Sequence, residues 1–248
     1  MALCWSLSRD SGYLAQSQRS APTYVTTNLF MNLDAGNASS YGGAGTTWTD
    51  LSGNGRNATL TNGPSFTGLQ GGYFHFTDTS FQYAITATVP SLTRWTIEGW
   101  YRPTKSLSGK VTSVVSNEYD LISKLNYSLG SNNAPFSYNF AGGFFDGSWH
   151  STSGLAPSLN TWYQGSVTYD GSTIVQYSNG ASQSSLSYAG TSQSGGAIRI
   201  ARRWDEAANV SSNFFDGDIS VVRVYSVALT SAQILQNYNS VKGRYGLA

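Results

Sequence analysis

Closely spaced turn signals are the feature that most restricts what this chain can fold into. Between Asn32 and Pro64, clusters rich in Gly and Asn separate short β-prone segments. Gly and Asn tolerate the positive φ values that tight turns require. Short apolar runs bounded by such turns predict antiparallel β-structure. The β-prone segments are 29–33, 46–49 and 57–61, and the turn clusters are 34–37, 42–43, 52–55 and 62–64.

The alternation of strands and turns continues along the rest of the chain. In a strand over 95–102, Ile97 and Glu98 are expected on opposite sides of the sheet, because successive side chains alternate. Segment 111–120 is predicted to form an inserted loop or hairpin. Other strands are predicted within 72–85, 136–145, 148–153, 162–169, 172–178, 197–203 and 218–225.

One short helix is predicted near the end of the chain. Thr230 and Gln233 have the spacing of a capping box, and Gly243 is expected to end the helix. We expect this helix to pack on an open edge of the sheets. The sequence thus predicts an all-β fold, a two-sheet antiparallel jellyroll sandwich with one short C-terminal helix. Its domain spans 27–248, preceded by an N-terminal arm over 1–26. The apolar stripe of the helix consists of Ile234, Tyr238 and Val241.

Several sequence blocks resemble one known family. The first is NLDAGNASSYGGAGTTWTDLSGNGRNATLTNGPSF, and others are WTIEGWYRP, LISKLNYSLG, NTWYQGSVTYDGSTIVQYSNG and FFDGDISVVRVYSVALTSAQILQNYNSVKGRYGL. Together they resemble the LamG-like jellyroll family of the concanavalin A-like lectin/glucanase superfamily, from Thr27 to the end of the chain. The resemblance implies the same sandwich fold, but a fold alone does not specify a function.

Charge and cysteine content exclude some functions and indicate a compartment. The formal net charge is +1 and no long run of Lys or Arg occurs, so we expect no nucleic-acid partner and no membrane surface. Cys4 is the only cysteine, which excludes an intrachain disulfide. Arg9 and Asp10 interrupt the apolar core that a signal peptide needs. We therefore expect synthesis in a host cytoplasm without a signal peptide.

Acidic residues do not form an obvious catalytic pair. Glycoside hydrolases use two carboxylates at a defined separation, and the chain has three glutamates, Glu98, Glu118 and Glu206. Glu118 and Asp120 are the nearest approach to a dyad, but an exposed loop pair is the preferred interpretation. Glu98 is interpreted as a structural acid within a sheet. We therefore expect a protein that is not an enzyme.

Calcium is the one cofactor that the resemblance suggests. Related lectin domains bind calcium near a loop rim, through hard oxygen ligands. By resemblance, the candidate ligands are Asp50, Asn54, Asn57 and Asp216. The alternative is that Asp50 and Asn54 cap turns through backbone N–H groups.

Aromatic residues in or beside loops are candidate platforms for a sugar. The apolar face of a sugar ring stacks on Trp or Tyr, while nearby Asn and Asp bind its hydroxyl groups. The alternative is that these aromatics belong to the core, as most do in a sandwich. The candidates are Tyr119, Tyr138, Phe144, Phe145 and Trp149.

The resemblance also extends to structural proteins of tailed bacteriophages. It implies a non-enzymatic virion protein, most simply a capsid decoration protein on the virion surface, able to adhere to carbohydrate. Its expected partners are the major capsid protein or other virion proteins, contacted through the N-terminal arm, and further copies of itself in a homo-oligomer. The alternative is a tail-fibre or spike module that binds cell-surface glycan, and a glycan hydrolase is less favoured.

Overall fold

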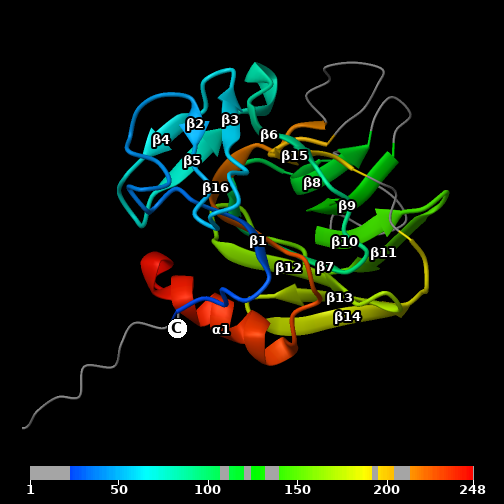
Figure 1. Ribbon diagram of the computed structural model, residues 1–248. Helices are drawn as coiled ribbons and strands as arrows, with labels where there is room; N and C mark the ends of the chain where they lie inside the picture. The colour runs from blue at the N-terminus through cyan, green and yellow to red at the C-terminus, as the bar shows by residue number, and fades with distance from the viewer. Residues whose placement is uncertain are drawn as a thin grey trace, which may run out of the picture.

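Two antiparallel sheets form a sandwich, as the turn pattern predicts (Figure 1). The computed structural model describes residues 23–106, 112–119, 124–131, 140–191, 195–203 and 213–247. Sheet A runs in the order β14 (Ala181–Ser187), β13 (Thr173–Ser178), β12 (Tyr163–Tyr169), β7 (Trp95–Pro103), β16 (Gly217–Tyr225), β5 (Tyr73–Phe76) and β4 (Ser65–Thr67), with β1 (Leu29–Asp34) also paired to β16. Sheet B runs in the order β11 (Trp149–Ser153), β10 (Phe140–Phe145), β9 (Lys124–Ser131), β8 (Ser113–Tyr119), β15 (Gly196–Ile200), β6 (Tyr83–Val89), β3 (Ala58–Thr61) and β2 (Thr47–Trp48).

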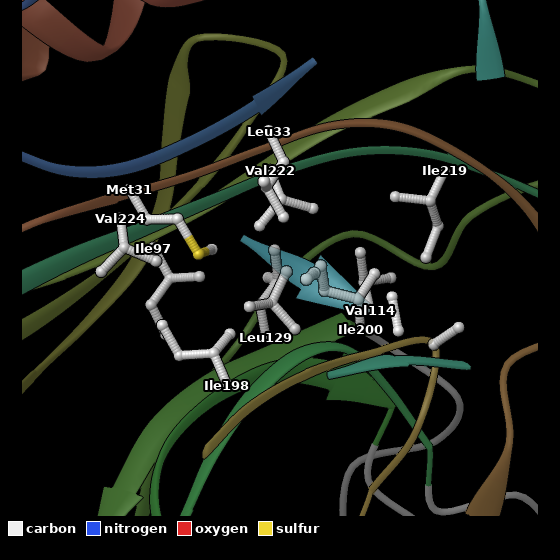
Figure 2. Packing of buried hydrophobic residues seen from close by; sticks show 14 of the residues in the cluster. Met31, Leu33, Ile97, Val114, Leu129, Ile198, Ile200, Ile219, Val222 and Val224 are labelled. Atoms are coloured by element: carbon white, nitrogen blue, oxygen red, sulfur yellow. The ribbon is translucent and has the colours of Figure 1, made fainter. Parts of the chain in front are cut away.

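The hydrophobic core fills the space between the two sheets. Ile97 and Val222 of sheet A meet Val114, Leu129 and Ile198 of sheet B there (Figure 2). All five side chains are fully buried. Burying one side chain of this size contributes about 1.5–3 kcal/mol. Because the core uses the inner faces, ligand-binding side chains are left to the outer faces and to the loops.

The two central strands of sheet A, β7 and β16, carry two charged pairs on one face. Asp218 lies opposite Arg102, and Arg223 lies opposite Glu98. Between these pairs the register shifts at Ser220, which is the extra residue of a β-bulge. A bulge changes which side chains face outward beyond it. Both charged pairs therefore lie on the outer face of sheet A.

Helix α1 (Ser231–Val241) covers part of that outer face. The predicted capping box of Thr230 and Gln233 is confirmed. Tyr238 and Val241, from the predicted apolar stripe, pack against the buried side chain of Trp100 in β7. The prediction that the helix packs on a sheet edge was wrong. An apolar patch on the outer face of sheet A supplies a surface that has to be covered, and the helix covers it.

The helical segment also extends further than predicted. A 3-10 turn, η3 (Lys242–Tyr245), follows α1 without a break, so Gly243 does not end the helical segment. Gly246, with φ of 67°, terminates it instead. Within η3, the guanidinium of Arg244 donates two hydrogen bonds of 2.6 and 2.7 Å to the carboxylate of Asp34 in β1. This pair joins the end of the chain to the first strand.

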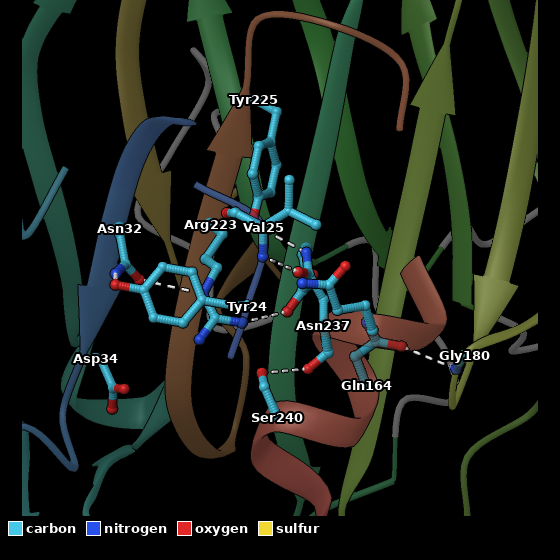
Figure 3. Close-up of polar contacts among 12 residues, drawn as sticks. Tyr24, Val25, Asn32, Asp34, Gln164, Gly180, Arg223, Tyr225, Asn237 and Ser240 are labelled. Carbon is cyan, nitrogen blue, oxygen red and sulfur yellow. Dashed lines mark hydrogen bonds and ion pairs between the residues drawn. The ribbon is translucent and has the colours of Figure 1, made fainter. Parts of the chain in front are cut away.

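The segment just before β1 is packed against the domain. The backbone N–H of Val25 donates to Asn237 in α1 (2.8 Å), and the hydroxyl of Tyr225 donates to the Val25 carbonyl (3.0 Å). The ring of Tyr24 lies 4.3 Å from the guanidinium carbon of Arg223 (Figure 3). These contacts attach the end of the predicted arm to the sandwich. Residues 1–22, which make up most of that arm, lie outside the described residues.

Two strands show where the sequence patterns were insufficient. Segment 111–120 was predicted to be an inserted loop or hairpin, yet it contains β8, which lies between β9 and β15 within sheet B. Val114 and Val115 are fully buried, so this strand is a structural part of the sandwich. Strand β14 was not predicted because its serine-rich sequence lacks apolar alternation. Its side chains are mostly exposed, as befits an edge strand.

Candidate ligand-binding surfaces

The β10–β11 hairpin carries three of the five aromatic residues predicted to bind a sugar. Phe144 is fully buried and belongs to the main core, so it is not an exposed platform. Phe145 and Trp149 lie directly opposite each other in the antiparallel pair and are half-buried. Because neighbouring residues alternate between faces, these two side chains lie on the outer face of sheet B. The side chain of Tyr119 and all of Tyr138 lie outside the described residues.

A hydrogen-bonded cluster stabilises the tip of this hairpin. One carboxylate oxygen of Asp146 contacts Nε2 of His150 (3.0 Å), and the other accepts from the hydroxyl of Tyr188 (2.7 Å). The rings of His150 and Tyr188 are stacked. Burial raises the pKa of Asp146, but hydrogen bonds from Tyr188, Ser148 and His150 lower it more, so the pKa lies below its usual range. Asp146 is therefore ionised at neutral pH and holds the hairpin against Tyr188, the residue after β14.

The turn around Asp50 contains three of the four predicted calcium ligands. One oxygen of Asp50 accepts from the backbone of Asn32 (2.8 Å) and Ser52 (2.9 Å). The other accepts from the Ser52 hydroxyl (2.7 Å) and from Arg56 N (2.9 Å). Asn57 accepts from the backbone of Asp50 at 2.9 Å. The oxygens of Asp50 thus already serve as turn caps, the alternative that the sequence left open.

Asn54, also in this turn, and Asp216, the fourth predicted ligand, have different partners. The side-chain nitrogen of Asn54 donates to the carbonyls of Leu29 (3.0 Å) and Phe30 (3.1 Å). Asp216 accepts from the Thr104 hydroxyl at 2.8 Å, so it does not share the hydrogen-bond network of the Asp50 turn. Among the described residues, no group of three or more His, Cys, Asp or Glu residues is placed to hold a metal ion. Calcium stays a prediction that these contacts do not support.

Glu98 forms a buried ion pair beneath α1. One oxygen accepts from Nη1 of Arg223 (2.9 Å) and the other from the side chain of Asn237 (2.8 Å). Nε of Arg223 donates to Asn32 at 3.3 Å (Figure 3). Glu98 and Arg223 are both fully buried, and Glu98 is hydrogen-bonded as expected of a structural acid. Glu118 lies in β8 with its side chain outside the described atoms, and Asp120 and Glu206 lie outside the described residues.

A second charged group, not predicted from the sequence, lies on the same outer face beyond the helix. Asp218 in β16 accepts from Nε of Arg102 (2.6 Å) and contacts Nδ1 of His75 (2.9 Å). Adjacent strands place these residues in one row across the sheet, which continues to Ser65 on edge strand β4. The Asp218 side chain is only 2% exposed, whereas those of Arg102 and His75 are 22% and 37% exposed. Two solvent-accessible donors are thus held by one buried carboxylate.

Aromatic rings border this Arg102–Asp218–His75 row. The guanidinium carbon of Arg102 lies 5.2 Å from the ring centre of Tyr73 and 5.3 Å from that of Trp162. Nη2 of Arg102 also donates to the Tyr73 hydroxyl at 3.3 Å. Tyr245 stacks on Trp162 with ring centres 4.1 Å apart. These contacts restrict the orientation of Arg102, because its guanidinium borders two rings whose centres lie 5.6 Å from each other.

The protonation of His75 is coupled to its carboxylate partner. The hydrogen bond to Asp218 raises the pKa of His75, burial opposes this shift, and the charge of Asp216 supports it. Nδ1 faces the carboxylate and therefore carries a proton in either state. Nε2 accepts when His75 is neutral and donates when it is protonated. At high pH the groups that can donate to a ligand are Arg102 and the Tyr73 hydroxyl. As pH falls, protonated His75 becomes a third donor.

Solved structures confirm the fold. Domain 4 of AbnA, an extracellular arabinanase from Geobacillus stearothermophilus solved with arabinotriose, matches 85% of this chain and 98% of its own, with a TM-score of 0.65 and 15% identity. The match to the binding domain of Paraclostridial Mosquitocidal Protein 1 covers 87% of this chain and 52% of the toxin domain, with a TM-score of 0.65 and 18% identity. The match to Trypanosoma rangeli sialidase, solved with sialic acid, covers 91% of this chain and 34% of the sialidase, with a TM-score of 0.64 and 13% identity. The chain therefore spans about half of the toxin domain and a third of the sialidase.

A family model places the chain more directly. The model for the concanavalin A-like lectin/glucanases superfamily matches residues 76–235, which is more than half of the 248 residues. A search of curated protein sequences finds no significant match. No helix in the described ranges is both long and apolar enough to cross a membrane. By its family match and by its sandwich fold, the chain belongs to the concanavalin A-like lectin/glucanase superfamily.

Proposed function

We propose that this protein is a non-catalytic carbohydrate-binding module. The observation that carries the proposal is the half-exposed pair Phe145 and Trp149, side by side on the outer face of sheet B. A sugar ring presents apolar C–H groups that pack on such rings. The Asp146 cluster stabilises the hairpin that presents the two rings, which lowers the entropy lost on binding. The likeness to an arabinanase domain solved with arabinotriose supports this class of ligand.

The proposal is tested by glycan-array screening of the full chain, followed by calorimetry with the best oligosaccharide. Trp149→Ala is expected to weaken binding at least fivefold, since one aromatic contact contributes about 1 kcal/mol. Leu235→Ala is the matched control, because Leu235 is an exposed hydrophobic residue on α1, over the other sheet. Equal affinities of the native chain and Trp149→Ala would overturn the assignment of this hairpin.

We also propose that the chain is displayed on a virion as a capsid decoration protein. The supporting observation is that Tyr24 and Val25, near the end of the predicted arm, pack against Arg223 and α1. From that point the arm over residues 1–22 would reach a capsid protein or a neighbouring copy in a homo-oligomer. The protein would then be made in a host cytoplasm and reside on the virion surface.

Co-sedimentation with capsids stripped of the protein tests this second proposal. The full chain is expected to rebind, and a version lacking residues 1–22 is expected not to. The shorter version keeps Tyr24 and Val25, so its domain contacts are unchanged. Parallel samples with calcium or EDTA test the calcium prediction. Failure of the full chain to rebind contradicts virion display without affecting the glycan experiment.

A further inference from the structure

We infer that the row formed by His75, Asp218 and Arg102 on the outer face of sheet A is a second ligand site, specific for a sugar that carries a carboxylate. The inference does not depend on the hairpin of sheet B, which lies on the other sheet. It rests on three observations: unused donors, a fixed geometry and a bordering aromatic ring.

The first observation concerns hydrogen-bonding capacity. Nε of Arg102 donates to Asp218 and Nη2 to Tyr73, while Nη1 has no hydrogen-bond partner among the described residues. Nδ1 of His75 contacts Asp218, and Nε2 likewise has no partner among them. Both oxygens of Asp218 are already engaged, and the Tyr73 hydroxyl can still donate. The groups left for a ligand are therefore donors, which suit an acceptor such as a carboxylate.

The second observation concerns charge and rigidity. Arg102 is held by Asp218 and by the rings of Tyr73 and Trp162, so little side-chain freedom is lost when it binds an anion. With His75 protonated, Arg102 and His75 outweigh the one negative charge of Asp218. The nearby Asp216 lies 3.8 Å from Nζ of Lys105, which also contacts Asp78 at 2.9 Å. The three residues of the row thus carry a net positive charge only when His75 is protonated.

The third observation distinguishes a sugar from a simple anion. The half-exposed ring of Tyr73 borders the donors, and a sugar ring can pack beside it. Ser65 lies opposite His75 on edge strand β4 and is exposed, so its small side chain leaves the row open and adds one hydroxyl. A carboxylate would occupy the Arg102 and His75 donors while the sugar hydroxyls contact Ser65 and Tyr73.

The pH dependence of this site has a defined sign. The groups that face His75 are Asp218 and Asp216, which favour its protonated form, and Arg102, which opposes it. Ser65, on the other side, is uncharged. A sugar carboxylate stays ionised between pH 6 and 8, so affinity is expected to rise as pH falls across that range.

The experiment measures calorimetric binding of the full chain to sialyllactose, trigalacturonic acid and lactose at pH 6 and pH 8. Both acidic sugars are expected to bind at least tenfold more tightly than lactose at pH 6 and to weaken at pH 8. His75→Gln should remove this pH dependence, and Arg102→Lys should weaken binding about tenfold, because lysine cannot reproduce the planar donor geometry. Circular dichroism confirms folding, and Tyr73→Phe replaces Arg102→Lys if the latter fails to fold.

Lys105→Gln is the matched control. It removes one positive charge from the same surface, but its amino group contacts Asp78 at 2.9 Å and Asp216 at 3.8 Å, neither of which belongs to the row. It should change affinity less than twofold. Equal binding of lactose, affinity that is independent of pH, or an equal loss in Lys105→Gln would each overturn the inference. Competition by inorganic sulfate as strong as that of the acidic sugars would show an anion site without sugar specificity, which also overturns it.

Discussion

Strands β7 and β16 carry two Arg–carboxylate pairs on one face, and the two pairs differ in what covers them. In the first, Arg223 of β16 lies opposite Glu98 of β7, beneath α1 and Tyr24. In the second, the charges are exchanged: Asp218 of β16 lies opposite Arg102 of β7. The first pair is fully buried, while Arg102 stays partly exposed.

The comparison shows how cover separates a structural pair from a candidate site. Under the helix, Asn32 and Asn237 supply the further hydrogen bonds that a buried ion pair requires. Beyond the helix the pair is completed by His75 and Tyr73, which are themselves partly exposed, and Nη1 of Arg102 has no hydrogen-bond partner among the described residues. The same chemistry thus stabilises the fold at one end of the strands and is available to a ligand at the other. Four predictions test this distinction.

The largest effect is expected from breaking the covered pair. Glu98→Ala leaves Arg223 buried without a counter-charge and should lower the free energy of unfolding by about 3–5 kcal/mol. Urea denaturation monitored by circular dichroism measures this value. A loss below 1 kcal/mol would show that water reaches the pair and that α1 does not seal it.

A smaller loss is expected when the cover is altered and the pair is left in place. Asn237→Ala removes the hydrogen bonds of one side chain to Glu98, Tyr225 and the Val25 backbone. The expected cost is about 2–3 kcal/mol, because buried groups lose their partners. The same denaturation experiment applies. Glycan binding at the Arg102 row should be unchanged, and a parallel loss there would indicate that the two regions are coupled.

Arg102→Ala should cost less than either change. Asp218 keeps the hydrogen bond to His75, and its partly exposed surroundings admit water where the guanidinium was. We expect a loss of about 1–2 kcal/mol in unfolding free energy. A loss as large as that of Glu98→Ala would mean that the open pair is structural too, which removes the distinction.

The smallest effect concerns the pH dependence of stability. The raised pKa of His75 means that its protonated form stabilises the folded state. That contribution is complete below the unfolded pKa of about 6.5 and is lost as pH rises through the folded pKa. The difference in thermal midpoint between the native chain and His75→Gln should therefore be larger at pH 5.5 than at pH 8.5. A constant difference would exclude the coupling to Asp218.

The sequence predicted the sandwich, because turn residues and strand alternation are local signals. It also predicted the capping box and the placement of Ile97 and Glu98 on opposite sides of the sheet, for the same reason. It did not predict the Arg102 row, whose members come from three strands that are distant in sequence. Period-2 alternation puts Tyr73 and His75 on one face of β5, but no local pattern indicates which strands become neighbours. Phe144 belongs to the core, the alternative that the sequence left open, because adjacent residues of one hairpin can lie on the core side and the surface side.

The bulge at Ser220 has a consequence for how this surface can change through insertion and deletion. Asp218 and Arg223 are five positions apart, an odd spacing that in a regular strand would put them on opposite sides of the sheet. Only the extra residue allows both to point outward. Loss of a single codon at this place would therefore turn one of the two charges into the hydrophobic core. The outward orientation of both the covered pair and the open site thus depends on Ser220, a residue that belongs to neither.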